Sequence, residues 1–349
     1  MKFYCIGLAS LFSILLFQCS NSNADYKAKD SVIKDSTNLS KKINGVSFVS
    51  PSTEVGKAEI EKPKHIIAAN ALSFMPYAFV EENSTKLLYN SKWQWWGEKT
   101  GGIEQMIELA QAEDYQIMLK PHVWKSHGAY TGKHSYSTEE EWVAFEKNYE
   151  NYILHYAKLA EDKKLTHFCI GTEWEQFVQQ RPDFWLDLIK KVRKIYSGKL
   201  SYASNWDEYL KVPFWSKLDL IGVDAYFPLL EAKTASTSEL KTALEPYKVA
   251  LQKLSDSLGK KILFTEYGYR SRDNTTHKPW KADREGRVNI KAQENAYEAF
   301  YATFWQESYI AGGFLWKWFP NHENIGGVNN NGFTPQNKPV EKLIFNYYQ

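Results

Sequence analysis

The alternation of short β-rich runs with longer amphipathic stretches is the feature that most restricts how this chain of 349 residues can fold. The runs share β-branched, aromatic and small apolar residues and read, in order, NGVSFVS, HIIAANALSFMPY, YQIMLKPHVW, HFCIGTE, KLSYASNW, DLIGVDAYFPL, KILFTEYGY and GGFLWKWF. The stretches between them repeat apolar residues every three or four positions and include GGIEQMIELAQAED, EEEWVAFEKNYENYILHYAKLAEDK, PDFWLDLIKKVRKIYSG and AQENAYEAFYATFWQES. This pattern is typical of parallel strands joined by crossover helices.

Strands and helices in this order close most economically into one (β/α)8 barrel. A doubly wound open sheet is the alternative, but no glycine-rich phosphate-binding turn follows the first run. The third helical stretch begins with Pro182 and is expected to end near Gly198, because proline favours the first helical position and glycine the residue beyond the last. We therefore expect an α/β protein with a single TIM-barrel domain over residues 43–349.

The N-terminal residues have the pattern of an export signal. One lysine precedes an apolar stretch over residues 3–17, which is too short for a membrane span but is typical of a signal peptide, here residues 1–18. The following Cys19 completes a sequence that resembles a lipobox, although Phe17 and Gln18 are bulkier than usual, so simple secretion is the alternative. Residues 19–42 hold few apolar side chains and predict a flexible tether.

These features predict an exported protein that touches a membrane only through a lipid on Cys19. It would be an outer-membrane lipoprotein facing the periplasm or the cell surface, or otherwise a secreted protein. The sequence does not indicate an oligomeric state.

Charge and cysteine content narrow the functional classes. Lys and Arg number 43 against 41 for Asp and Glu, and a net charge of +2 gives no basic footprint for nucleic acid. Cys169 is the one cysteine in the predicted domain, so no disulfide framework is possible, and its apolar neighbours indicate a small buried side chain.

Few motifs point to a metal or a cofactor. The chain has no His-Glu-x-x-His, no phosphate loop and no Gly-x-Ser-x-Gly. His122, His127 and His134 lie close in sequence, but His122 ends a strand and the other two belong to a loop. We predict neither a catalytic metal nor a cofactor.

The predicted strand ends are polar and aromatic, whereas the strand bodies are aliphatic. In TIM barrels the C-terminal strand ends carry the functional groups. These ends comprise Ser50, residues 75–77, 120–124, 172–173, 205–207, 224–226, 266–267 and 316–318.

The fourth and seventh ends each finish in a glutamate preceded by threonine. Side-chain alternation would place Cys169, Gly171 and Glu173 on one face, and Phe264 with Glu266 on another, and we expect both faces to line the barrel interior. Glu175 follows two residues after Glu173 and is the weaker candidate.

A pair of carboxylates across a cleft suits cleavage of a glycosidic bond. The alternative is structural, with each glutamate capping a helix or pairing with a lysine, but two at matching strand ends favour catalysis. The chain is also 15% aromatic, and aromatic rings serve as platforms for sugar faces. The loop SKWQWWGE offers Trp93, Trp95 and Trp96, either as such a platform or as an internal cluster. Residues 321–331 are turn-rich and indicate a mobile rim.

The strings MLKPHVW, FCIGTEWEQF, SYASNWDEY, FWSKLDLIGVDAYFPL, ILFTEYGYRS and GGFLWKW together resemble glycoside hydrolase family 113, from about Asn44 nearly to the C-terminus. The resemblance implies a (β/α)8 barrel with catalytic glutamates on strands four and seven, and retaining hydrolysis of β-1,4-mannan. It implies that Glu173 in GTE is the acid/base, that Glu266 in FTEYGY is the nucleophile and that Tyr226 in DAYFP hydrogen-bonds the nucleophile.

One position departs from the wider clan, because Thr172 stands where an asparagine usually precedes the acid/base. That asparagine normally holds the sugar 2-hydroxyl, so we expect Asn205 or His122 to supply the contact. The other expected substrate-binding residues lie at strand ends or on the tryptophan loop, and the full set is Tyr226, Asn205, Trp206, His122, Lys120, Trp124, Trp316 and Trp95.

The predicted function is that of a retaining glycoside hydrolase, an endo-β-1,4-mannanase acting on a polysaccharide or oligosaccharide. A retaining site holds its two carboxyl groups about 5 to 5.5 Å apart, and a dry wall such as Trp174 or Trp124 would keep Glu173 protonated. Two alternatives are open: an exo-acting or other β-glycan hydrolase of the same clan, and a glycan-binding surface lipoprotein without catalysis.

Overall fold

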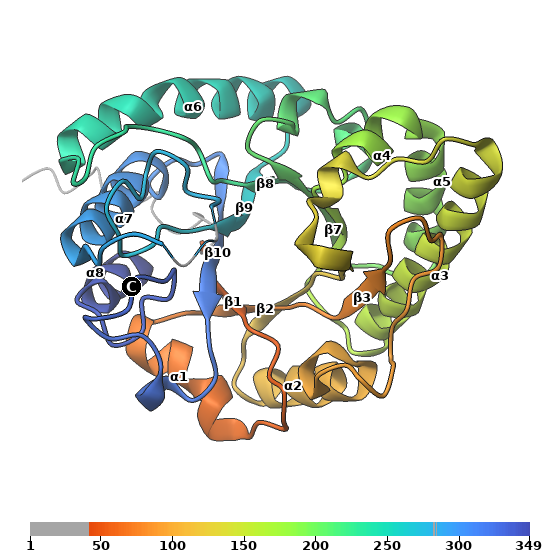
Figure 1. The fold of residues 1–349 in the computed structure, drawn as a ribbon, viewed down its shortest axis with the longest axis horizontal. Helices are drawn as coiled ribbons and strands as arrows, with labels where there is room; N and C mark the ends of the chain where they lie inside the picture. The colour runs from red at the N-terminus through yellow and green to blue at the C-terminus, as the bar shows by residue number, and fades with distance from the viewer. Residues whose placement is uncertain (1–41, 282, 284) are drawn as a thin grey trace, which may run out of the picture. The chain divides into compact units, whose positions relative to one another are not determined.

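The computed structural model describes residues 42–281, 283 and 285–349. The predicted signal peptide, Cys19 and almost all of the predicted tether lie outside these residues. The described part forms a closed barrel of eight parallel strands in the order β1-β10-β9-β8-β7-β6-β4-β2. Figure 1 shows the helices arranged around the strands. The barrel strands are β1 (Ile43–Phe48), β2 (Ala71–Phe74), β4 (Gln116–Leu119), β6 (His167–Thr172), β7 (Lys199–Asn205), β8 (Ile221–Asp224), β9 (Ile262–Tyr267) and β10 (Ile310–Trp318). The predicted fold class is confirmed.

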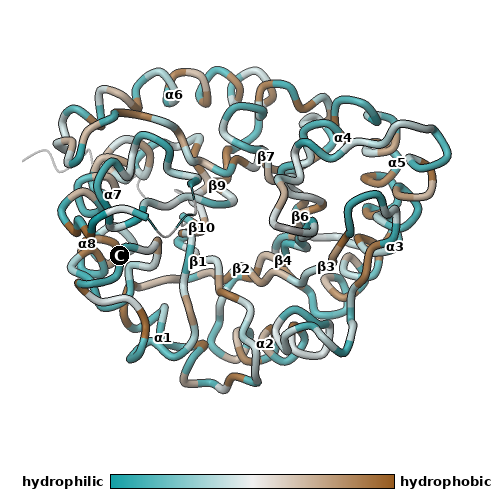
Figure 2. The backbone as a smooth tube through the Cα atoms, viewed as in Figure 1, coloured by the Kyte–Doolittle hydropathy of each residue, from teal (hydrophilic) through white to brown (hydrophobic). Residues whose placement is uncertain are grey.

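Helices surround the barrel. They are α1 (Lys57–Ile67), α2 (Thr100–Ala112), α3 (Glu139–Asp162), α4 (Glu175–Gln180), α5 (Pro182–Arg193), α6 (Thr237–Leu258), α7 (Ile290–Phe304) and α8 (Val340–Tyr348). The two longest, α3 and α6, begin with capping boxes at Thr138 and Ser236, whose side chains accept hydrogen bonds from the N3 backbone. In Figure 2 the tube of α6 alternates between hydrophilic and hydrophobic segments, as expected for a helix that covers a core with one face.

Side chains fill the barrel interior below the site. The filling cluster takes about one buried residue from each strand: Ile43, Ala71, Met118, Cys169, Ala203, Leu220, Leu263 and Phe314. A larger, aromatic-rich cluster packs between the strands and the helices. Cys169 is therefore a buried interior side chain, as predicted, and its thiol donates to the Gly171 carbonyl.

Two predicted strands are each split in the structure. The second run becomes β2 and β3 (Tyr77–Val80), and the third becomes β4 and β5 (His122–Lys125). Pro76 and Pro121 stand at the breaks, since proline has no backbone N–H to donate to a ladder. Strands β3 and β5 then pair with each other as a separate two-stranded parallel sheet beyond the barrel strands.

Two predicted boundaries were wrong. Residues 65–67, read as the start of a strand, complete α1. Helix α5 does begin at Pro182, but it ends at Arg193, well before Gly198.

The joint between β1 and β10 needs a glycine. Gly312 has a φ of +121°, and a Cβ there would lie 2.2 Å from the Ile43 carbonyl oxygen. From α8, the Tyr348 hydroxyl donates to the Gly45 carbonyl at 3.0 Å. Gly312 thus lets the first and last strands approach closely, and the Tyr348 hydrogen bond ties α8 to β1.

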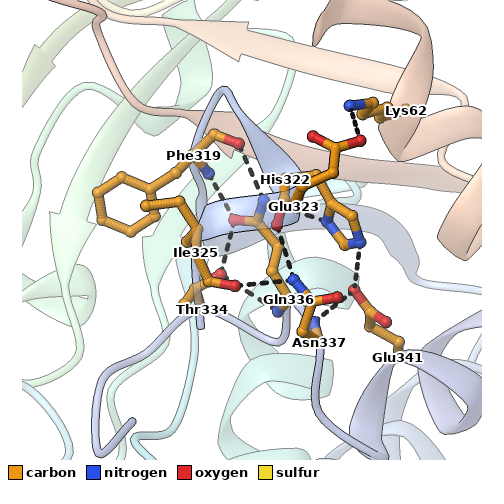
Figure 3. A network of polar contacts seen from close by, with 9 residues as sticks. All are labelled: Lys62, Phe319, His322, Glu323, Ile325, Thr334, Gln336, Asn337 and Glu341. Carbon is orange, nitrogen blue, oxygen red and sulfur yellow. Dashed lines mark hydrogen bonds and ion pairs between the residues drawn. The ribbon is translucent and has the colours of Figure 1, made fainter. Parts of the chain in front are cut away.

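The segment after β10, predicted to be a mobile rim, is anchored by polar contacts (Figure 3). The Gln336 amide exchanges two hydrogen bonds with the backbone of Phe319, at 2.7 and 2.9 Å. Asn337 donates to the carbonyls of His322 and Ile325, and the His322 ring lies 3.6 Å from the Glu341 carboxylate of α8. The rim is thus fixed to the segment that leads into α8 and, through His322, to α8 itself.

Across the described residues, we find no helix that combines the length and the apolar character needed to span a membrane.

Candidate active site

Both strands that carry the candidate glutamates contain an extra residue just before them. On β6, Cys169 pairs with Ser201 but Thr172 pairs with Ala203, so three steps on β6 face two on β7. Ile170 packs in the outer cluster, and a Cβ on Gly171 would lie 2.8 Å from the Trp185 ring of α5. The expectation that Gly171 lines the interior was therefore wrong. After this β-bulge, Glu173 has a φ of +54°, and its N–H donates to the Ala203 carbonyl at 2.8 Å.

On β9 the bulge lies at Thr265. Val223 of β8 pairs with Phe264 and the next residue, Asp224, pairs with Glu266. Phe264 packs against Phe300 of α7 with ring centroids 5.1 Å apart, so the prediction that Phe264 shares the inner face was also wrong. Because the bulge adds one residue, Glu266 points inward even though Phe264 points outward.

The Glu266 carboxylate receives hydrogen bonds at both oxygens. The Lys120 ammonium donates to Oε1 at 2.7 Å, and the Tyr226 hydroxyl donates to Oε2 at 2.8 Å. Glu266 is 7% exposed, and Lys120 is completely buried. Two donated hydrogen bonds, one from a cation, stabilise the ionised carboxylate.

A second buried carboxylate, Asp224, completes the charge cluster. Its Oδ1 accepts from the Thr265 hydroxyl at 2.7 Å and lies 3.4 Å from the Lys120 ammonium. Burial raises the pKa of Asp224 to about 7, against the opposing effect of Lys120. Burial by itself would lower the pKa of Lys120, but Asp224 and Glu266 outweigh this and raise it. Sequence reasoning placed Asp224 at a strand end but gave it no role.

The surroundings of Glu173 favour the protonated carboxyl. Burial raises its pKa well above the ordinary glutamate value, and the charges of Asp224 and Glu266 raise it further, while Lys120 lowers it. Its pocket is lined by Tyr130 and Asn205 among others. The Trp174 ring packs edge-to-face against Tyr149 in the cluster behind the strand end. Trp124 is half exposed and does not provide the dry wall that we expected.

His122 lies beside Glu266, with Nε2 3.8 Å from the carboxylate Oε1. Burial and Lys120 lower the pKa of His122 well below its usual value, so the ring is neutral. The ring lies parallel to Trp316 at 6.5 Å and edge-on to Tyr77 at 5.3 Å. Among the described residues no hydrogen-bond partner reaches its buried Nε2.

A cavity of about 620 Å³ opens beside Trp316 and Tyr77. The tryptophan loop forms much of its wall, because Trp93 and Trp95 line it, and Trp124 of β5 lines it as well. Trp93 is 82% exposed. Trp96 instead packs against the core at the start of η1 (Trp96–Glu98), so the loop both lines the cavity and is anchored to the core. Lys317, joined to Trp316 by a cis peptide bond, also lines this cavity.

Asn205 ends β7 and Trp206 follows it, and Asn205 lines the same pocket as Glu173. The Asn205 amide donates to the Tyr130 hydroxyl at 3.1 Å, and its oxygen accepts from the Trp206 N–H. Tyr130 belongs to a long loop with no periodic pattern, so sequence reasoning could not find it. The structure thus brings all the predicted strand-end residues to the same end of the barrel.

Among the side chains that the structure describes, no group of three suitable residues could hold a metal ion. His134 is buried among aromatic rings such as Phe145, and burial lowers its pKa to about 4.

The chain matches a family model described as Glycoside Hydrolase Family 113 over residues 52–338. Among curated proteins, none gives a significant match. One similar solved structure is a GH113 beta-1,4-mannanase in a complex, which is 23% identical over 89% of this chain and 99% of that chain, with a TM-score of 0.77. Another is the GH113 beta-mannanase AaManA from Alicyclobacillus acidocaldarius in complex with ManMIm, which is 23% identical over 88% of this chain and 97% of that chain, with a TM-score of 0.77. A Faecalibacterium prausnitzii beta-glucuronidase is 13% identical over 88% of this chain and 49% of that chain, with a TM-score of 0.60. At these identities the structural matches establish the fold.

Proposed function

The chain belongs to glycoside hydrolase family 113, and from that membership we propose that it is an endo-β-1,4-mannanase that retains the anomeric configuration. The observation that carries the proposal is the pair of glutamates at the ends of β6 and β9, held in opposite electrostatic environments. Two titratable groups whose surroundings favour different protonation states can divide the acid and the nucleophile roles between them.

Glu266 is the proposed nucleophile. Lys120 and Tyr226 donate hydrogen bonds to its two oxygens, which keeps an anion ready to attack the anomeric carbon. Attack forms a covalent glycosyl-enzyme and breaks the bond to the leaving oxygen.

Glu173 is the proposed acid/base. Its raised pKa keeps the carboxyl protonated near neutral pH, so it can give its proton to the leaving oxygen. Once ionised, it removes a proton from the water that hydrolyses the intermediate, and this step restores both carboxyl groups.

His122 is the better of our two candidates for the sugar 2-hydroxyl contact. Its neutral ring has an unpartnered nitrogen 3.8 Å from the nucleophile, whereas both polar atoms of the Asn205 amide already have partners. A neutral imidazole nitrogen can accept or donate a hydrogen bond to a hydroxyl. Trp316 and Tyr77 would then border the sugar that reacts with Glu266.

The test is reducing-end release on β-mannan, glucomannan, galactomannan, cellulose and xylan, with product sizes and the anomer first formed followed by NMR. We expect short oligosaccharides from the mannans and a β-anomeric product. Glu173→Gln and Glu266→Gln should each lower kcat by at least about a thousandfold, while Glu175→Gln, a matched carboxylate two residues from the acid, stays near the wild type.

Other outcomes would replace the proposal. Mannose as the sole product would identify an exo-acting enzyme, and release from another β-glycan would change the substrate. A folded protein that acts on none of these polysaccharides but binds them would be a glycan-binding protein. An α-anomeric first product would exclude retention.

We also propose that the protein is exported and lipidated at Cys19, with residues 1–18 removed. Support comes from the apolar stretch and the lipobox-like sequence. Cells given labelled palmitate should incorporate the label into the wild type and not into Cys19→Ala, and the label should sediment with membranes. Equal labelling of the two proteins would exclude Cys19 as the site.

A further inference from the structure

A pair of tryptophans, one exposed and one partly buried, bridges two loops at the C-terminal end of the barrel. Trp206 directly follows β7, and Trp280 belongs to the loop between β9 and α7. Their rings stack with centroids 5.2 Å apart and planes 20° apart, and Trp280 remains 41% exposed. Strand β8 separates β7 from β9 in the barrel order, so the loop that carries Trp280 passes over one strand end to reach Trp206. The stacked rings present a flat apolar surface of the kind that sugar faces pack against.

The position of the pair relative to the glutamates indicates which part of a substrate it would meet. The backbone of Glu173 is hydrogen-bonded to β7, and Asn205 at the end of β7 lines the Glu173 pocket. The acid must lie next to the leaving oxygen, so the departing sugars extend toward β7. The 620 Å³ cavity with Trp316 lies toward His122 and Glu266 instead, and it suits the sugars that become attached to the enzyme.

Polar side chains accompany the tryptophans. Asp207 follows Trp206 directly, and the Asn205 amide and the Tyr130 hydroxyl are already hydrogen-bonded to each other nearby. A site of this kind offers an apolar face to the C–H surface of a pyranose ring and hydrogen-bonding groups to its hydroxyls.

We infer that Trp280, stacked on Trp206, is a binding platform for the leaving-group part of a β-1,4-linked pyranose chain. The inference rests on the proposed function, because the direction of the substrate follows from Glu173 being the acid. It adds a specific role for the β9–α7 loop: the loop selects substrates that continue beyond the scissile bond.

The test compares two substrates of the enzyme. Mannohexaose places sugars on both sides of the cleaved bond, whereas the leaving group of β-mannobiosyl fluoride is a single atom. We expect Trp280→Ala to lower kcat/KM for mannohexaose roughly tenfold and to change that for the fluoride by less than about twofold. Trp280→Phe should lower kcat/KM for mannohexaose by less than Trp280→Ala does. Val249 is an apolar residue of similar exposure on α6, and Val249→Ala should leave kcat/KM for both substrates unchanged. An equal loss on both substrates, or none on mannohexaose, overturns the inference.

Calorimetry separates this inference from the proposed function. If the wild type hydrolyses no mannoside, the proposed function fails, and the platform is then judged by binding of mannohexaose, cellohexaose and xylohexaose to Glu266→Gln. Weaker binding in Glu266→Gln/Trp280→Ala supports the platform. Unchanged affinity, or no binding of any of the three, overturns it.

Discussion

Replacing Lys120 by methionine tests the charge cluster under the site most directly. The ammonium is completely buried, 2.7 Å from Glu266 and 3.4 Å from Asp224, and methionine has a similar volume without the charge. Removing one partner of a buried ion pair costs about 3–5 kcal/mol, because the remaining charge has lost its compensation. Such a loss is a large part of the 5–15 kcal/mol that typically stabilises a domain.

The loss should depend on pH with a definite sign. Asp224 has a pKa of about 7 in the folded protein, raised above its unfolded value by burial, and Lys120 holds it lower than it would otherwise be. Without Lys120 the pKa rises further. A group with a raised folded pKa contributes stability below its unfolded pKa and loses it as the pH rises through the folded pKa. The loss of stability in Lys120→Met should therefore be smaller near pH 5, where only the contact with Glu266 is lost, and larger at pH 8, where Asp224 has begun to ionise without its partner.

Urea unfolding followed by circular dichroism at both pH values measures the effect. Adding Asp224→Asn to Lys120→Met removes the uncompensated carboxylate, so the double variant should be more stable than the single one at pH 8. Lys317→Met is the control, because burial lowers the pKa of Lys317 against a weaker opposing effect of Glu266, and no carboxylate of the described residues forms a close ion pair with it, so the change should cost less than Lys120→Met. A deficit below about 1 kcal/mol at pH 8, or an equal deficit at both pH values, would refute the reasoning.

Three further predictions concern catalysis and the tryptophan loop. Tyr226→Phe removes the hydrogen bond to Glu266 Oε2. A loss of about 1.5–3 kcal/mol of transition-state stabilisation should lower kcat/KM roughly 10- to 100-fold while Tm stays unchanged. A decrease in kcat/KM of less than about threefold would contradict this role of Tyr226. Asp224→Asn removes a charge that raises the pKa of Glu173, so the alkaline limb of the kcat/KM profile should move to lower pH, and an unmoved limb would show that the two groups do not interact. In α2, a Cβ on Gly102 would lie 2.1 Å from the Trp96 carbonyl oxygen, so Gly102→Ala should lower Tm and should raise KM by displacing the loop that carries Trp95. A Cβ on the neighbouring Gly101 would meet nothing within 4 Å, so Gly101→Ala should be neutral or stabilising. Equal effects of the two substitutions would exclude the clash.

Where strands keep their strict alternation, the sequence was enough to orient the site. Met118 fills the barrel, and one two-residue step from it places Lys120 at the mouth, before Pro121 breaks the run and His122 begins β5. Period-two patterning fixes which side chains share a face, so these residues could be predicted without coordinates.

The remainder depends on contacts that no local pattern encodes. The bulges before Glu173 and Glu266 show only in pairing register with neighbouring strands, which is why the faces of Gly171 and Phe264 were misassigned. Tyr130 and Trp280 reach the site from long loops, whose paths are set by tertiary contacts.

The bulge at Thr265 has a consequence for anyone who would transplant this site. An idealised barrel with regular strands would accept the residues of β9 one for one, yet it would direct the Glu266 side chain toward the helices. A transplant into regular strands must therefore either keep the bulge or leave out its extra residue, because the number of residues between Phe264 and Glu266 sets the face of the carboxylate. Deleting Thr265 is the corresponding operation here: Glu266 would follow the outward-facing Phe264 directly and keep its inward direction, and the hydrogen bond from the Thr265 hydroxyl to Asp224 would be lost.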